Sequence, residues 1–243
     1  MANRLEAYEA RHRLAVDENS VTIAGLVREV GSLPVRVSLS NNGTALGEAE
    51  TLSDGLFSHV VPLEVGLNEI AVTATDSAGG TVQALVPVIR LITDRTYNDR
   101  LALEELLKRA VSEWTEQERT AFYKGLYKGG YSRADLNRVV LAAQYLSSAL
   151  NNAGYFVVQK ADGGWTAESW LSPMDAETYL ADAEAIRNAL PLPSDAPKVP
   201  QTLEKLGLNE ANSIEKILVL TDRVLSQIQV SNWYAGEIFS GEV

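Results

Sequence analysis

The sequence of 243 residues contains no cysteine and only two histidines, His12 and His59. Disulfide bonds, thiolate metal sites and a catalytic cysteine are therefore excluded. The sequence offers too few ligands or bases for a zinc site or a histidine-dependent triad, because its two histidines fall in different predicted segments of the chain. We expect the protein to use no cofactor and no metal, and we interpret His59 as a surface residue of a strand.

Positive charge is also scarce, with 21 Lys and Arg against 32 Asp and Glu and a formal net charge of −11. The acidic excess is spread over the whole chain, so it would repel nucleic-acid phosphates and anionic membrane surfaces. The longest apolar run, Ala84–Ile89, is far too short to cross a bilayer. The first ten residues are polar and lack the apolar stretch of a secretory signal. We predict no nucleic-acid partner, no membrane insertion and no export by the usual route.

Residues 20–95 consist of short runs rich in Val, Ile, Leu and Thr, separated by turn residues. Val35–Leu39 alternates apolar and polar side chains, and Asn41-Asn42-Gly43 is a strong turn signal. Several such strands with regularly spaced turns predict a β-sandwich. Residues 1–19 hold few large apolar side chains, and we interpret them as an N-terminal arm, either a frayed end or a segment that orders on a neighbouring subunit.

The pattern becomes helical over residues 96–243. Thr115 and Ser132 each begin a capping box that predicts the start of a helix. Apolar spacing predicts one buried helix face from Leu101, Leu103, Leu106, Leu107, Ala110 and Val111. Further helices are predicted near 136–150, 175–190 and 209–229, with a proline-rich extended connector at 191–200. A short apolar run followed by a glycine turn predicts a small β-hairpin near 155–166.

The β segment carries four recognisable stretches: Val21–Gly25, Asp54–Ser58, Leu63–Val72 and Ala74–Gly79. In order, they resemble the strands and the Asp-Gly-x-Phe and Gly-x-Asn turns of bacterial immunoglobulin-like domains. This resemblance implies the fold but says little about function, because such modules are general adhesive and spacer units. The predicted fold is therefore multidomain: an all-β immunoglobulin-like sandwich over 20–95, then a mainly α-helical domain over 96–243 with a small hairpin.

The helical part resembles a segment of tail-associated structural proteins of bacteriophages and prophages. The residues that carry this resemblance are Thr93–Thr96, Tyr131–Val139, Trp170, Met174, Tyr179, Leu180, Ile186, Arg187, Pro197, Pro200, Leu206, Glu210–Leu218 and Gly236–Ile238. The resemblance implies a non-enzymatic virion protein of the tail, baseplate or fibre attachment, assembled in the host bacterial cytoplasm. Its expected partners are other virion proteins and copies of itself.

Aromatic residues gather in the helical part, which holds all four tryptophans. Trp165 and Trp170 stand beside Gly and Ser, and Trp233 and Tyr234 lie near the C-terminus. Exposed aromatic rings anchor protein interfaces or stack on sugars, so these four are candidates for a protein interface or a glycan-binding site, with core packing as the alternative for each. The alternative function is a carbohydrate-binding adhesin module that recognises host surface glycans.

A hydrolase with paired carboxylates is a third hypothesis. Asp54, Asp76, Asp162 and Asp175 all stand at predicted turns or helix starts, where Asp stabilises backbone geometry, so we assign no catalytic residue. The turns at Asp76 and Asp162 lack the spacing of a known calcium loop. Asn212 and Glu215 share one helix, and if they are buried we expect them to hydrogen-bond a loop such as 197–201.

Overall fold

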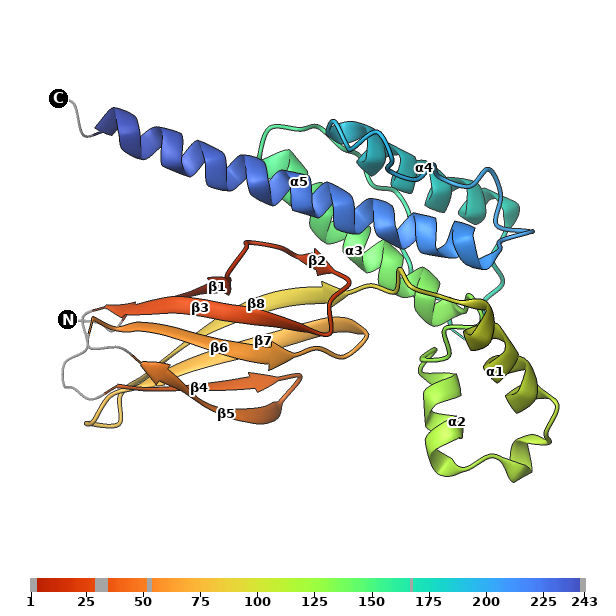
Figure 1. Ribbon diagram of the computed structural model, residues 1–243, viewed down its shortest axis with the longest axis horizontal. Helices are drawn as coiled ribbons and strands as arrows, with labels where there is room; N and C mark the ends of the chain where they lie inside the picture. Colours follow the sequence, from red (N-terminus) through yellow and green to blue (C-terminus); the bar gives the residue numbers. More distant parts are fainter. Residues whose placement is uncertain (1–3, 29–34, 52–53, 167, 241–243) are drawn as a thin grey trace. The chain divides into compact units, whose positions relative to one another are not determined.

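The computed structural model describes residues 4–28, 35–51, 54–166 and 168–240, although the side chains of Arg4, Arg28, Glu50 and residues 232–240 lie outside the description. The chain divides into two compact units, Met1–Arg90 and Leu91–Val243 (Figure 1). The first unit contains strands and the second contains helices. Each unit is described by itself.

The strands of the first unit form a two-layered sandwich. They are β1 (Arg4–Glu9), β2 (Ala15–Val16), β3 (Ser20–Arg28), β4 (Arg36–Asn41), β5 (Thr44–Thr51), β6 (Leu56–Pro62), β7 (Gly66–Thr75) and β8 (Thr81–Arg90). The hydrogen-bonded order is β1-β3-β6-β5-β4-β7-β8-β2. Strand β5 pairs with β4 and then, at its end, with β6, so it passes from one layer to the other. The predicted β-sandwich is confirmed.

Alternating side chains fill the space between the two layers. In β7, Asn68, Ile70, Val72 and Ala74 point inward and are buried, and they pack with residues of β3, β4 and β6 in one apolar core. Asn68 is the polar member of this set. Its amide donates to the carbonyl oxygens of Glu64 and Gly66 and accepts from Asn41 at 2.7 Å, which explains how a polar group is tolerated there.

The prediction of an N-terminal arm is wrong for the described residues. Strand β1 pairs antiparallel with β3, and β2 pairs parallel with β8, so both belong to the sandwich. The polar composition is misleading because two of the charges are inside the fold. Arg13 and Glu9 are buried and form an ion pair at 3.4 Å, and Arg13 also bonds Glu18 at 2.7 Å.

The described residues of the second unit form six helical elements. They are α1 (Tyr97–Leu107), the 3-10 helix η1 (Val111–Glu113), α2 (Glu116–Tyr123), α3 (Arg133–Asn152), α4 (Pro173–Ala189) and α5 (Leu208–Ser240). The predicted capping boxes at Thr115 and Ser132 are confirmed. Asp175 is not the N-cap of α4, because Ser172 takes that place and Asp175 completes its capping box. In the described part of the chain, no helix has the length and apolarity needed to cross a membrane.

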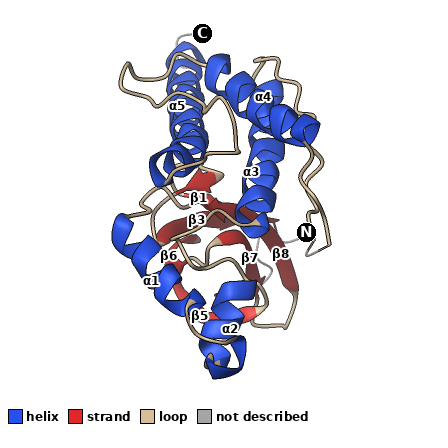
Figure 2. Cartoon of the chain, turned by 90° about the vertical axis from the view of Figure 1, so that its right-hand side faces the viewer, coloured by secondary structure: helices blue, strands red, loops and turns tan. Residues whose placement is uncertain are grey.

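Helices α3, α4 and α5 lie side by side and run in the same direction (Figures 1 and 2). Parallel neighbours need a long return segment between them, and residues 153–172 and 190–207 provide the two returns. The first return runs back along α3. Its start, at Val157, bonds the side chain of Asn151 near the end of α3, and its later part, at Trp165, bonds Asn137 near the beginning.

The predicted β-hairpin near 155–166 is wrong, because that described range contains no strand. Its backbone groups bond side chains of helices instead of a neighbouring strand. The carboxylate of Asp182, which is buried in α4, accepts the N–H groups of Lys160 and Ala161 at distances of 2.7–3.0 Å. A short apolar run therefore packs along the bundle as an extended segment.

Candidate interaction site

Four charged side chains meet inside the helical unit. Arg95 precedes α1, Asp135 and Arg138 lie at the start of α3, and Glu215 lies in α5. All four are buried. Arg95 bonds Asp135 at 2.7 Å and Glu215 at 2.5 Å, while Arg138 bonds Asp135 at 2.5 Å and Glu215 at 2.9 Å. Two cations and two anions thus balance, which is the condition for keeping charge away from water. We call these four residues the ionic cluster.

The ionic cluster also fixes the segment that enters the helical unit. Glu215 Oε2 accepts the N–H of Ile92 at 2.7 Å. The side chain of Asn212 accepts the N–H of Arg95 at 2.9 Å and donates to its carbonyl oxygen at 3.0 Å. The expectation that Asn212 and Glu215 bond loop 197–201 is therefore wrong; the backbone groups that they bond are those of Ile92 and Arg95. For the same reason the helical unit begins at Leu91 instead of at residue 96.

The surroundings keep Asp135, Arg95 and Arg138 charged. Burial opposes ionisation of Asp135, but Arg138 and Arg95 outweigh it and hold the pKa of Asp135 below its ordinary value. Burial also opposes the charge on Arg95 and Arg138, and the two carboxylates overcome it, so the pKa of each arginine is raised. Asp135, Arg95 and Arg138 are therefore charged near neutral pH, and the cluster has the properties of a structural lock.

The lowered pKa of Asp135 predicts a specific pH dependence of stability. Its folded pKa lies below the unfolded value of about 3.9, so its contribution is fully present above that pH and is lost as the pH falls through the folded value. We expect Asp135→Asn to be less stable at neutral pH and to show a flatter acid limb. Urea unfolding followed by tryptophan fluorescence between about pH 3 and 7 tests this.

The matched control for this experiment is Asp162→Asn, which changes an exposed aspartate in the same unit. The control should keep the slope of the wild-type protein below about pH 4. An acid limb for Asp135→Asn that runs parallel to those of wild type and control would contradict the assignment.

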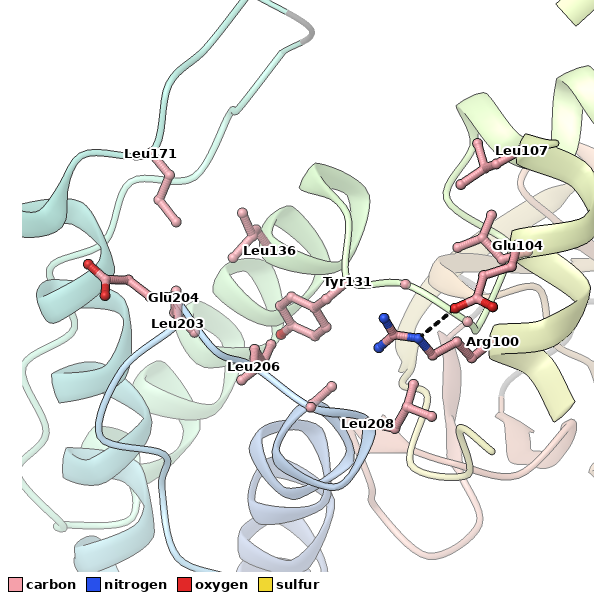
Figure 3. Close-up of a pocket in the computed structure, with 15 residues that line it drawn as sticks. Arg100, Glu104, Leu107, Tyr131, Leu136, Leu171, Leu203, Glu204, Leu206 and Leu208 are labelled. Carbon is pink, nitrogen blue, oxygen red and sulfur yellow. Dashed lines mark hydrogen bonds and ion pairs between the residues drawn. The ribbon is translucent and has the colours of Figure 1, made fainter. Parts of the chain in front are cut away.

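A leucine-lined cleft of about 420 Å³ opens in the helical unit (Figure 3). Its walls come from α1, from the turn before α3 and the start of α3 itself, from the first turn of α5 and from the segments that precede α4 and α5. The leucines that line it are Leu103, Leu107, Leu136, Leu171, Leu203, Leu206 and Leu208. Tyr131 forms part of the wall and joins cleft to cluster, because the guanidinium of Arg95 lies 5.2 Å from the centre of its ring.

Few polar groups line the cleft. Arg100 is bonded to Glu104 at 3.0 Å, and Glu204 is the remaining charged residue that lines the cleft. The hydroxyl groups of Tyr131 and Tyr179 hydrogen-bond each other at 2.5 Å, and burial raises the pKa of both phenols. Such a lining suits apolar side chains. Among the described residues, no group of three or more His, Asp or Glu side chains is placed to hold a metal ion.

The four aromatic residues predicted from the sequence have different environments. Trp165 is half-buried and packs edge-on against Tyr179, with both its backbone N–H and its carbonyl bonded to Asn137 at 2.9 Å. Trp170 is 93% exposed, just before α4. Trp233 and Tyr234 fall in α5, but their side chains lie outside the described residues. Trp165 is thus a packing residue, while Trp170 remains a candidate for binding.

Sequence reasoning missed two other exposed apolar features. Phe156, expected in a strand, is 88% exposed. Residues 97–128, which contain α1, η1 and α2, also expose large apolar side chains, and we call them the appendage. They are Tyr97, Leu101, Leu107, Val111, Tyr123 and Leu126. The predicted buried face of the first helix is wrong, because only Leu106 of α1 is buried. Helical spacing reveals a shared face but not what covers it.

Comparisons with known proteins concern the β-sandwich. The family described as glucodextranase, domain B, matches residues 11–92. The first unit is an immunoglobulin-like domain. The fibronectin(III)-like modules of CbhA from Clostridium thermocellum are a solved structure with 17% identity, covering 36% of this chain and 94% of that one. The TM-score of 0.29 is too low for this likeness to support a statement about fold or function.

No curated protein matches the chain. The family match ends at residue 92 and therefore describes the immunoglobulin-like domain without extending to α1–α5. Any functional statement about the helical unit must accordingly rest on its own residues.

Proposed function

We propose that this protein is a structural component of a bacteriophage virion, in the tail, the baseplate or a fibre attachment, and that it acts by protein–protein assembly. The observation that carries the proposal is the surface of the helical unit. Large apolar side chains are exposed beside a leucine-lined cleft, while the ionic cluster is buried. Exposed apolar surface of this kind becomes favourable when another protein covers it.

The arrangement of the ionic cluster supports the virion context. The residues that resemble phage tail proteins include Thr93–Thr96, Tyr131–Val139 and Glu210–Leu218. These three stretches are far apart in the sequence, yet Arg95, Asp135 and Glu215 bring them into direct contact. A resemblance that falls on residues which bond one another fits a shared structural core, whereas scattered surface matches would not.

Association with particles tests the proposed function. Cells that carry the gene are induced to release particles, the particles are banded in a density gradient, and an antibody to this chain locates it. We expect the chain to band with tail-bearing particles and to resist a salt wash. A chain that stays entirely in the unsedimented fraction, while a known tail protein bands normally, would contradict the proposal.

A carbohydrate-binding module is a second candidate, and the exposure of Trp170 favours it. An uncovered indole ring provides a flat face on which a sugar can stack. The domain B match comes from a protein named for glucodextranase, which is the further reason to test glucans. A glycan array probed with the wild-type chain decides between the two candidates. The assembly hypothesis predicts no specific binding to any sugar, and the adhesin hypothesis predicts binding to particular glycans.

Changing Trp170 to Ala sharpens that decision. Because the ring is 93% exposed, we expect the free energy of unfolding to stay within about 0.5 kcal/mol of wild type, measured by urea titration. Met174→Ala, at an exposed apolar position four residues further on in the first turn of α4, is the matched control. A glycan signal that is lost with Trp170→Ala and kept with Met174→Ala would support the adhesin in place of the assembly role.

A further inference from the structure

We infer that the appendage, residues 97–128, is a contact surface between copies of this chain. The inference rests on the proposed assembly role and names the surface and the partner. Three observations carry it: the small internal core of the appendage, its exposed apolar side chains and its charge.

The appendage buries little of its own apolar surface. Leu106 and Trp114 are its only buried large side chains, and they meet where the indole Nε1 of Trp114 donates to the carbonyl oxygen of Leu106 at 3.1 Å. Phe122 adds an edge-on ring contact at 4.9 Å from Trp114. This small core fixes the shape of α1, η1 and α2. It leaves Tyr97, Tyr123 and four aliphatic side chains in water.

Tyrosine and leucine side chains in such a position resemble the centre of an interface. Interface cores are enriched in aromatic residues, and covering a large apolar side chain contributes roughly 1.5–3 kcal/mol. One side of a standard interface involves about 20–30 residues, which is close to the size of the appendage. Its six exposed apolar side chains are therefore suited to the centre of such an interface, with polar residues of the appendage around them.

Charge favours a second copy as the partner. Residues 97–128 contain six acidic and six basic side chains, so the appendage is neutral, and the other 26 acidic and 15 basic side chains carry the whole net charge of −11. Most of the appendage charges are paired locally, for example Lys108 with Glu105 at 2.5 Å and Arg119 with Glu116 at 3.2 Å. Two acidic copies repel each other least when these neutral segments meet, whereas a basic partner would be drawn to the acidic remainder.

Sedimentation equilibrium of the full-length protein tests the inference. Tyr123→Glu places a charge on the exposed face of the appendage, and Val60→Glu is the matched control, because it adds the same charge at an equally exposed site in β6 (58% and 62% exposed). We expect wild type and Val60→Glu to self-associate with the same dissociation constant. In Tyr123→Glu we expect the dissociation constant to rise at least tenfold. Circular dichroism should show that both variants keep the wild-type fold.

Salt provides a second readout. Because the net charge of −11 opposes association, added salt should strengthen self-association of the wild type. A wild-type protein that stays monomeric at all concentrations, equal weakening in both variants, or association that weakens with salt would each overturn the inference. Particle association is measured separately: banding of a monomeric chain with particles would remove only this inference, while self-association without banding would remove only the virion role.

Discussion

Replacing Glu215 by Ala is expected to lower the free energy of unfolding of the helical unit by about 3–5 kcal/mol. The carboxylate bonds Arg95, Arg138 and the N–H of Ile92, and all of its contacts are buried. Its removal leaves two guanidinium groups with a single carboxylate between them in a site that excludes water. An uncompensated buried charge costs far more than a lost surface ion pair.

Tryptophan fluorescence provides a clean measurement for this variant, because all four tryptophans lie in the helical unit and none lies in the sandwich. Urea titration therefore reports on the helical unit alone. Lys216→Ala, an exposed neighbour on the same helix, is the control and should change the stability by less than about 0.5 kcal/mol. Equal stability of the two variants would show that the ionic cluster does not hold the unit together.

Replacing Asp182 by Ala is expected to destabilise the helical unit by about 3 kcal/mol, because one carboxylate accepts the N–H groups of two residues. Lys160 and Ala161 would lose their acceptor, and Ala161 is buried, so water cannot replace the carboxylate without local opening. The return segment along α3 should therefore loosen before the helices do.

Hydrogen exchange measures this loosening residue by residue. In Asp182→Ala we expect the amides of Lys160 and Ala161 to exchange faster than in wild type. The exchange rates of amides in the middle of α3 should change only as far as the change in global stability requires. Glu177→Ala, an exposed position on α4, is the control. Unchanged protection at Lys160 and Ala161 would contradict the role assigned to Asp182.

Local signals made much of this fold predictable. The alternation in β7 and the turn at Asn42 and Gly43 depend on neighbouring residues, as do the capping boxes at Thr115 and Ser132, so the sequence pattern identifies them correctly. Their existence does not require knowledge of which segments meet in space.

The errors fall where distant residues decide the structure. Strand β1 carries charges that make it look like an arm, and its pairing with β3 together with the burial of Glu9 and Arg13 places it in the sandwich. The extended return at 155–166 uses side-chain acceptors, such as Asp182, in place of a partner strand. The partners of Glu215 lie 77 to 123 positions away, so helical spacing has no means of indicating them.

The candidate site was partly predictable for the same reason. Trp165 and Trp170 were both candidates for an exposed ring, with core packing as the alternative, and the sequence did not separate them: Trp170 is 93% exposed, whereas Trp165 packs against Tyr179. The cleft and the appendage depend on which side of α1 remains uncovered. That property belongs to the packing of the whole unit, and a helical stripe such as Leu101 to Val111 does not determine it.

Cryo-electron microscopy of purified particles tests the assembly role most directly. We expect density in the tail region that fits the three parallel helices α3–α5, repeated about a symmetry axis, with residues 97–128 at a contact between copies. Tail density that is fully explained by other proteins, in particles from cells that express this chain, would contradict it.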